Sequence, residues 1–202
     1  MTRWMVLAVG VAAVAGGAAQ AAQTWTDPAD VRAGTYAVEP EHTQIVWGVS
    51  HFGLTTFYGT FSGVSGRLTV DPKNPGASTL SVSVPVASVL STSAKLDGML
   101  KGPAWFDGKK YPVLNFVSTK VTQTGAGTAR VDGTLTMHGV SKPETLAVKF
   151  NGAAINPIDH SYSIGFEASG TVRRSEFGVT AYVPVVGDDV TLMISGAFEA
   201  AK

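Results

Sequence analysis

The 202-residue sequence contains no cysteine. Without thiols the chain can form no disulfide bond, no thiolate metal site and no covalent attachment to a c-type haem. A cysteine nucleophile is excluded for the same reason. The hydrophobic interior must therefore stabilise the fold alone.

Charged side chains are also scarce. Asp, Glu, Lys and Arg make up 15% of the sequence, whereas about 25% is usual in soluble domains. The 15 basic and 15 acidic side chains cancel, and no basic run or stripe is present. This balance argues against nucleic acid, or an anionic membrane surface, as a main partner.

The signatures of common enzymes are missing as well. The sequence has no Gly-x-Ser-x-Gly nucleophile elbow and no glycine-rich phosphate loop between a strand and a helix. The neighbouring carboxylates of Asp188 and Asp189 fall in a predicted turn, where solvation is more common than a glycosidase pair. We therefore predict a protein that is not an enzyme and that carries no cofactor.

The four histidines do not follow a metal-binding spacing. His42 and His51 would meet if they closed one end of a hairpin, with Glu39 or Glu41 beside them. Histidines outside such motifs more often bind backbone groups or face water. We predict no metal site, and a His-based metal or haem protein is kept as the weakest alternative.

The first 21 residues have the features of a secretory signal peptide. Arg3 gives a short positive start, an apolar run covers residues 5–19, and Ala19-Gln20-Ala21 offers a small-x-small cleavage site. The apolar run is shorter than the roughly 20 residues that span a bilayer, so an uncleaved N-terminal anchor is the less favoured alternative. We predict that residues 1–21 are removed and that the mature protein is exported.

The rest of the chain suits one all-β domain. Residues 22–34 are polar and contain Pro28, which predicts an extended leader before a domain at 35–202. Residues 36–66 alternate, are rich in aromatic and β-branched side chains, and carry five glycines that permit sharp strand bends. We expect this stretch to supply the first strands and one mouth of a closed or nearly closed structure.

Alternation continues downstream in short runs separated by turn residues. Beyond the two strands expected around residues 45–49 and 57–61, it predicts strands at 113–120, 128–137, 145–151, 162–171, 180–186 and 191–198. Gly187-Asp188-Asp189 is predicted to be a turn between the last two. Eight or so strands indicate a barrel or a sandwich.

One helical segment is predicted within residues 91–106. Leu96, Met99 and Leu100 follow the i, i+3, i+4 spacing of a helix face, and Ser91, Thr92 or Ser93 can cap its start. The mouth of a barrel is the natural place for this face to pack, and the edge of a sandwich is the alternative.

An eight-stranded barrel has an interior just wide enough for side chains or for one ligand. Composition alone leaves both options open. An outer-membrane eight-stranded barrel shares the export signal and the alternation. Short polar-faced strands and the ending Glu199-Ala200-Ala201-Lys202, which lacks a terminal aromatic, argue against that alternative.

Several segments, in order, resemble the YceI-like family of periplasmic polyisoprenoid-binding proteins. The resemblance covers about residues 35–199, and each motif is weak alone whereas the ordered set is fairly specific. The segments are Tyr36-Ala37-Val38-Glu39-Pro40 with His42-Thr43; His51-Phe52-Gly53; Tyr58-Gly59-Thr60-Phe61 with Gly66; Trp105-Phe106-Asp107 with Tyr111-Pro112 and Phe116; Gly133 to Pro143; Arg174-Ser175-Glu176-Phe177-Gly178; and Val186-Gly187-Asp188-Asp189-Val190.

This resemblance implies an eight-stranded antiparallel, lipocalin-like barrel in the periplasm, with one short helical segment near the mouth. It implies a ligand that is a polyisoprenoid or another long-chain lipid, and a membrane lipid donor or a cytochrome b561-type membrane protein as partner. The oligomeric state, a dimer included, is left open. Residues 95–100 depart from the Arg-Asp and His-Leu pattern of relatives, which leaves the headgroup preference undetermined.

We predict that the ligand site is mainly aromatic and aliphatic, because each buried CH₂-sized unit contributes about 0.8 kcal/mol. His42 and His51 are expected near a mouth. The predicted lining residues are Phe52, Phe57, Phe61, Leu96, Leu100, Trp105, Phe106, Phe116, Phe166 and Phe177.

Overall fold

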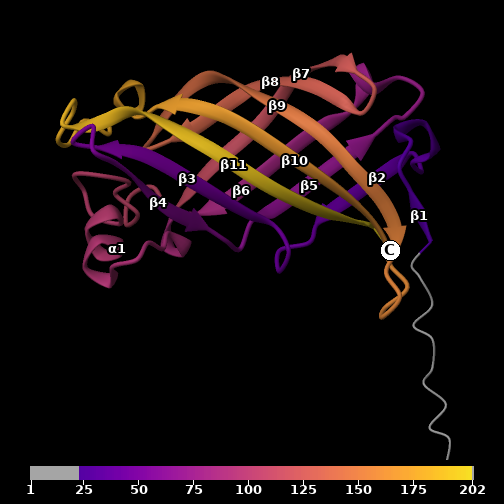
Figure 1. Ribbon diagram of the computed structural model, residues 1–202, viewed down its shortest axis with the longest axis horizontal. Helices are drawn as coiled ribbons and strands as arrows, with labels where there is room; N and C mark the ends of the chain where they lie inside the picture. Colours follow the sequence, from indigo (N-terminus) through magenta and orange to yellow (C-terminus); the bar gives the residue numbers. More distant parts are fainter. Residues whose placement is uncertain (1–22, 202) are drawn as a thin grey trace, which may run out of the picture.

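The computed structural model describes residues 23–201, so the predicted signal peptide at 1–21 lies outside the described part. Its strands wind into an elongated barrel, with α1 (Ala94–Leu100) at one end and the short β1 near the other (Figure 1). The strands are β1 (Thr24–Trp25), β2 (Gly34–Val38), β3 (Gln44–His51), β4 (Thr55–Phe61), β5 (Ser65–Val70), β6 (Thr79–Pro85), β7 (Val113–Gly125), β8 (Thr128–Met137), β9 (Val140–Ile155), β10 (Tyr162–Arg173) and β11 (Val186–Ala200). The 3₁₀ helices are η1 (Pro28–Asp30), η2 (Pro75–Ala77), η3 (Val86–Ser88) and η4 (Arg174–Phe177).

The barrel closes through antiparallel pairs in the order β2, β5, β6, β7, β8, β9, β10, β11 and back to β2. β3 pairs with the first part of β11 while β2 pairs with its last residues, so β2 and β3 together form one interrupted strand. β4 extends β5 in the same way, because β4 pairs with β3 and β5 with β2. The predicted eight-stranded antiparallel barrel is confirmed.

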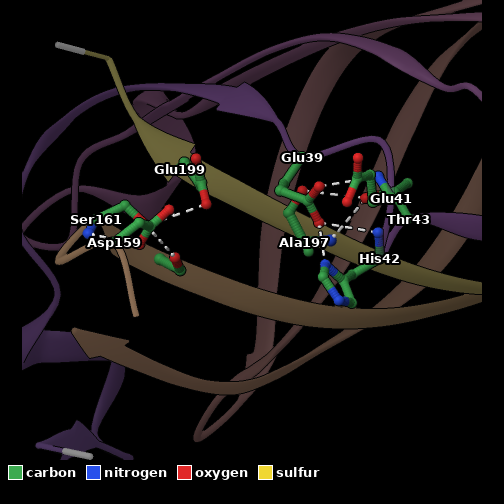
Figure 2. A network of polar contacts seen from close by, with 9 residues as sticks. Glu39, Glu41, His42, Thr43, Asp159, Ser161, Ala197 and Glu199 are labelled. Carbon is green, nitrogen blue, oxygen red and sulfur yellow. Dashed lines mark hydrogen bonds and ion pairs between the residues drawn. The ribbon is translucent and has the colours of Figure 1, made fainter. Parts of the chain in front are cut away.

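The interruption between β2 and β3 is bridged by a side chain. The Thr43 hydroxyl accepts a hydrogen bond from the Ala197 amide at 2.9 Å and donates one to the Ala197 carbonyl at 3.1 Å. The Glu39 amide donates to the same carbonyl at 2.9 Å. Figure 2 shows this contact between the loop and β11. This contact keeps the barrel closed at the point where backbone pairing with β11 is interrupted between β2 and β3.

The predicted strand at 180–186 is wrong, because residues 181–185 form a turn and β11 begins only at Val186. The Val183 amide donates to the Thr180 carbonyl, and Tyr182 adopts a left-handed φ of 61°. The predicted turn at Gly187-Asp188-Asp189 is likewise wrong, since these residues belong to β11. They form a bulge opposite β3, where the pairing shifts between Val186 and Val190. A bulge leaves backbone groups unpaired in the ladder, and a buried arginine takes up two of them, as described below.

The predicted helix is confirmed over Ala94–Leu100. The Ser93 side chain accepts a hydrogen bond from the Leu96 amide, as an N-cap does. Leu100 is buried, and the loop that follows returns to the barrel, where the rings of Phe61 and Phe106 meet edge to face at 5.5 Å. The helical segment therefore covers one end of the barrel.

The polar segment before the domain packs onto the barrel rather than only extending away from it. β1 pairs with β9, and Val31 is buried. The Arg32 guanidinium lies over the Tyr162 ring at 4.2 Å, and the Arg32 carbonyl accepts a hydrogen bond from the Tyr36 hydroxyl. Burial and the nearby Tyr162 raise the pKa of Tyr36 to about 12. This segment closes the end of the barrel opposite α1.

Candidate functional site

The interior near α1 holds a cavity of about 200 Å³ with a mainly apolar wall. We call it the first chamber. The helix side contributes Leu100, Trp105 and Phe106, and the starts of β7 and β11 contribute further side chains. Five predicted lining residues are found here: Phe61, Leu100, Trp105, Phe106 and Phe116. Such concave apolar sites are typical of small-molecule binding.

The other predicted aromatic and aliphatic residues lie elsewhere. Phe166 lines a second cavity further along the barrel. Phe57 packs against Trp47 at 5.9 Å, and Phe177 is fully buried in the core. Leu96 is half-buried on α1. Phe52 is 56% exposed at the tip of the β3–β4 hairpin and lines neither cavity.

The structure does not bring His42 and His51 together, because they flank opposite ends of β3. Nδ1 of His42 lies 2.6 Å from a carboxylate oxygen of Glu39 (Figure 2). The His42 side chain is 80% exposed. The ring of His51 contacts that of Phe52 at 4.1 Å. Neither histidine lines the first chamber or the second cavity. Within residues 23–201, no group of three or more histidine and acidic side chains is placed to hold a metal ion.

Three aromatic rings of the first chamber lie against glycines. Trp47 covers Gly59, its partner across the β3–β4 pair, so closely that any Cβ there would collide with the indole. Phe116 covers Gly133 of β8 in the same way. Phe198 bends back over Gly196, where a Cβ would lie 3.2 Å from the Phe198 ring. Each glycine therefore makes room for a ring on the chamber wall, a role different from the sharp strand bends that we predicted for glycines of residues 36–66.

The rim of the first chamber is held by Arg174 of η4, which is only 4% exposed. Its guanidinium donates to the backbone carbonyls of Val179, Val186 and Gly187 at 2.8 to 2.9 Å. Two of those carbonyls belong to the β11 bulge. Burial lowers the pKa of Arg174, although nearby Asp188 opposes the shift, and arginine stays charged in proteins.

Asp188 holds the same region from the other side, and we call the contacts of Arg174 and Asp188 together the lock. Its carboxylate accepts hydrogen bonds from the amide and the hydroxyl of Ser175 at 2.8 and 2.6 Å. Partial burial opposes the shift, but these two bonds and the neighbouring arginines hold the pKa of Asp188 below its ordinary value. The motifs at residues 174–178 and 186–190 are thus bound to one another. These bonds fix the turn at residues 181–185, which packs on the helical segment.

Trp105 joins that turn to the helical segment. Its ring lies 5.2 Å from the Arg174 guanidinium carbon and 6.3 Å from the ring of Tyr182. On the other side of η4, the carbonyl of Phe177 contacts Nδ1 of His138 at 3.1 Å. The motif residues therefore build the closed end of the first chamber.

One carboxyl group lies on the chamber wall. Glu144 points inward from β9 and has neither a hydrogen bond nor an ion pair within the described residues. Burial and the nearby Glu176 raise its pKa above the ordinary value. With Asn115 it is among the few polar side chains of the chamber. We did not select Glu144 from the sequence, although its alternation with apolar residues of β9 was the available signal.

The α1 end also carries exposed apolar side chains. Leu54 is 83% exposed and Tyr182 is 66% exposed, and the Phe52 amide donates to the Val185 carbonyl, which joins the two tips. Phe52 and Tyr182 both have left-handed φ angles, of 56° and 61°, which bulky residues rarely adopt.

None of the helices among residues 23–201 is long and apolar enough to cross a membrane.

Sequence comparison identifies relatives along most of the chain. A family model described as the YceI-like domain matches residues 36–198. A UPF0312 protein of Pseudomonas putida is 38% identical over 173 residues, which cover 86% of this chain and 84% of that protein. A UPF0312 protein of Yersinia pestis is 32% identical over 157 residues, covering 78% of this chain and 81% of that protein.

Solved structures share the fold. The YCEI protein of Campylobacter jejuni aligns with a TM-score of 0.67 and 28% identity, covering 76% of this chain and 90% of that one. BcnA of Burkholderia cenocepacia aligns with a TM-score of 0.72 and 21% identity over 79% and 98% of the two chains. A polyisoprenoid binding domain of Saccharophagus degradans aligns with a TM-score of 0.60 and 13% identity over 84% and 100%.

Proposed function

Because the chain belongs to the YceI-like family, we propose that it binds one long-chain apolar ligand, of polyisoprenoid type, inside its barrel and has no catalytic role. The observation that carries this proposal is the first chamber, a cavity of about 200 Å³ with a mainly apolar wall. The polyisoprenoid binding domain with the same fold supports the choice of ligand.

The chamber wall favours a tail over a charged headgroup. Each CH₂-sized unit that leaves water contributes about 0.8 kcal/mol, so a branched hydrocarbon of several units needs no salt bridge to bind. Glu144 and Asn115 are placed to bind a hydroxyl or carbonyl group of the ligand at the wall. A carboxyl with a raised pKa is better suited to a neutral polar group than to an anion.

The outward faces of the strands support a protein that works in water. Outer-membrane barrels present an apolar band to lipid. Here Arg130 of β8 and Lys149 of β9 are exposed, and Arg130 pairs with Asp132 at 2.8 Å. The Thr145 hydroxyl donates to the same carboxylate at 2.7 Å. A polar network of this kind is suited to contact with solvent.

Export and carriage belong to the same proposal. The mature chain would begin near Ala22, act in the periplasm, and exchange its ligand with a membrane lipid donor or a cytochrome b561-type membrane protein. The exposed apolar tips near α1 offer a surface for such an exchange. Fractionation followed by N-terminal sequencing tests the location. A full-length chain found only in the cytoplasm would exclude export.

Neighbouring positions on β11 provide a matched test of the binding site. Leu192 points into the first chamber, whereas Met193 is 51% exposed on the outside. Leu192→Trp fills the chamber and is expected to lower the affinity for farnesol at least tenfold in calorimetric titration. Met193→Trp adds the same side chain outside and should bind as wild type does. Equal affinity of all three proteins would contradict binding in this chamber.

A further inference from the structure

The barrel holds a second cavity, of about 180 Å³, which we call the second chamber. It lies towards the end opposite α1, because the end of β7 lines it while the start of β7 lines the first chamber. The start of β8 likewise lines the second chamber and its end lines the first. Its wall is also mainly apolar, with Leu68, Val131, Val148 and Phe150 among the lining residues.

Within residues 23–201, Phe198 is the one residue that lines both chambers. Its side chain is buried, 7% exposed, and meets Phe166 edge to face at 6.0 Å. Phe166 in turn contacts Phe150 at 5.6 Å. These rings form a row inside the barrel, and Phe198 is the member at the boundary between the chambers.

The backbone at Phe198 is held on both sides, so any opening must come from the side chain. Phe198 pairs with Val38 of β2 and with Ile164 of β10. The neighbouring Gly196 lines the first chamber and has no side chain to obstruct a turning ring. A change of rotamer at Phe198 would move its ring without breaking these strand pairs.

Chamber size shows why joining them matters. An engineered apolar cavity of about 150 Å³ holds one benzene molecule. The first chamber, of about 200 Å³, therefore holds a ring-sized group or a short branched segment. A chain of several isoprene units exceeds that space and needs the second chamber as well.

We propose that Phe198 is a gate between the two chambers and sets the length of apolar chain that the barrel accepts. This proposal rests on the proposed function. A short isoprenoid occupies the first chamber with the gate shut. A longer one displaces the Phe198 ring and extends its tail into the second chamber. Binding of a long ligand therefore breaks the contact between the closed Phe198 ring and Phe166, which lowers its affinity.

The test is a titration with isoprenoid alcohols of two, three and four isoprene units, followed by calorimetry. Trp47 and Trp105 line the first chamber, so quenching of tryptophan fluorescence reports entry there. In Phe198→Ala the affinity for the longest alcohol should rise at least tenfold relative to the shortest. Phe198→Leu should give a smaller gain and serves if the alanine variant does not fold.

The control is Met193→Ala on the outer face of β11. Met193 is 51% exposed and lines neither chamber, so this substitution should leave the preference for chain length within a factor of about three. The gate is overturned if a folded Phe198 variant keeps the wild-type length profile. It is also overturned if wild type binds two short alcohols at once and the variant gains nothing for the long one. If wild type binds no alcohol of any length, the proposed function itself fails, and the gate with it.

Discussion

The indole ring of Trp47 lies directly on the backbone of Gly59, its cross-strand neighbour in the β3–β4 pair. A side chain at position 59 would meet this ring and also the Leu90 carbonyl oxygen, at 2.7 Å from a Cβ. Since Trp47 lines the first chamber, the absence of a side chain at Gly59 shapes the chamber wall.

Gly59→Ala should therefore push Trp47 into the chamber. We expect a loss of about 1–3 kcal/mol in the free energy of unfolding, as for other overpacked cores, together with weaker binding of farnesol. The control is Gly98→Ala on α1, where a Cβ meets nothing within 4 Å. This substitution should stabilise the helix by about 0.5–1 kcal/mol. Chemical denaturation measures both. Equal behaviour of the two variants would show that Trp47 does not depend on Gly59.

Thr43→Val tests the bridge across the interrupted strand. Valine keeps the shape but leaves the partly buried Ala197 amide without its Thr43 partner, whereas the Ala197 carbonyl still accepts from the Glu39 amide. We expect a loss of about 1–3 kcal/mol. Thr119→Val removes an exposed hydroxyl bond to the Asp132 carbonyl and should change stability by less than about 0.5 kcal/mol. An equal loss in both variants would contradict a special role for Thr43.

Arg174→Lys tests the lock at the closed end. A single ammonium group cannot reproduce the planar fork that binds three carbonyls, so we expect a loss of roughly 3 kcal/mol. The adjacent Arg173 is 58% exposed and makes only long surface ion pairs, so Arg173→Lys should cost less than about 1 kcal/mol. Thermal unfolding compares them. If Arg173→Lys is the more damaging change, the assignment of the lock is wrong.

The inward carboxyl of Glu144 predicts a pH dependence. Burial and Glu176 raise its pKa in the folded state above the ordinary 4.5. The folded chain therefore binds this proton more tightly than the unfolded chain, and ionised Glu144 costs stability at neutral pH. This cost vanishes as the pH falls through the raised pKa towards 4.5.

Glu144→Gln should accordingly have a higher Tm than wild type at pH 7, and the difference should shrink as the pH approaches 4.5. Glu176→Gln removes the second cause of the shift and should act in the same direction but more weakly. Scanning calorimetry across this pH range measures both effects. A wild type that is the more stable protein at pH 7 would contradict the account.

Much of the barrel could be predicted from local patterns. Alternation correctly placed strands at 128–137 and 162–171, which lie in β8 and β10, and the helix spacing located α1. The start of β11 could not be predicted, because its bulge depends on Arg174 and Asp188, whose partners are set by tertiary contacts. The lining set was uncertain for a similar reason, since a tip residue such as Phe52 has the same local texture as an inward one.

The structural role of the glycines was the hardest feature to predict from the sequence. In the sequence, Gly59 looks like a bend point of a strongly curved strand. In the structure it receives the ring of Trp47, and Gly133, for which we made no prediction, receives that of Phe116. Which ring covers which glycine depends on strand pairing and register, and a single sequence does not determine either of these.

The central claim, that an apolar ligand occupies the barrel, is tested most directly by native mass spectrometry of the mature protein purified from its own cells without detergent. We predict a bound mass that is lost on solvent extraction and identified as an isoprenoid or long-chain lipid, with lower occupancy in Leu192→Trp than in Met193→Trp. Protein that carries only its own mass, with no extractable lipid in either variant, would contradict the account.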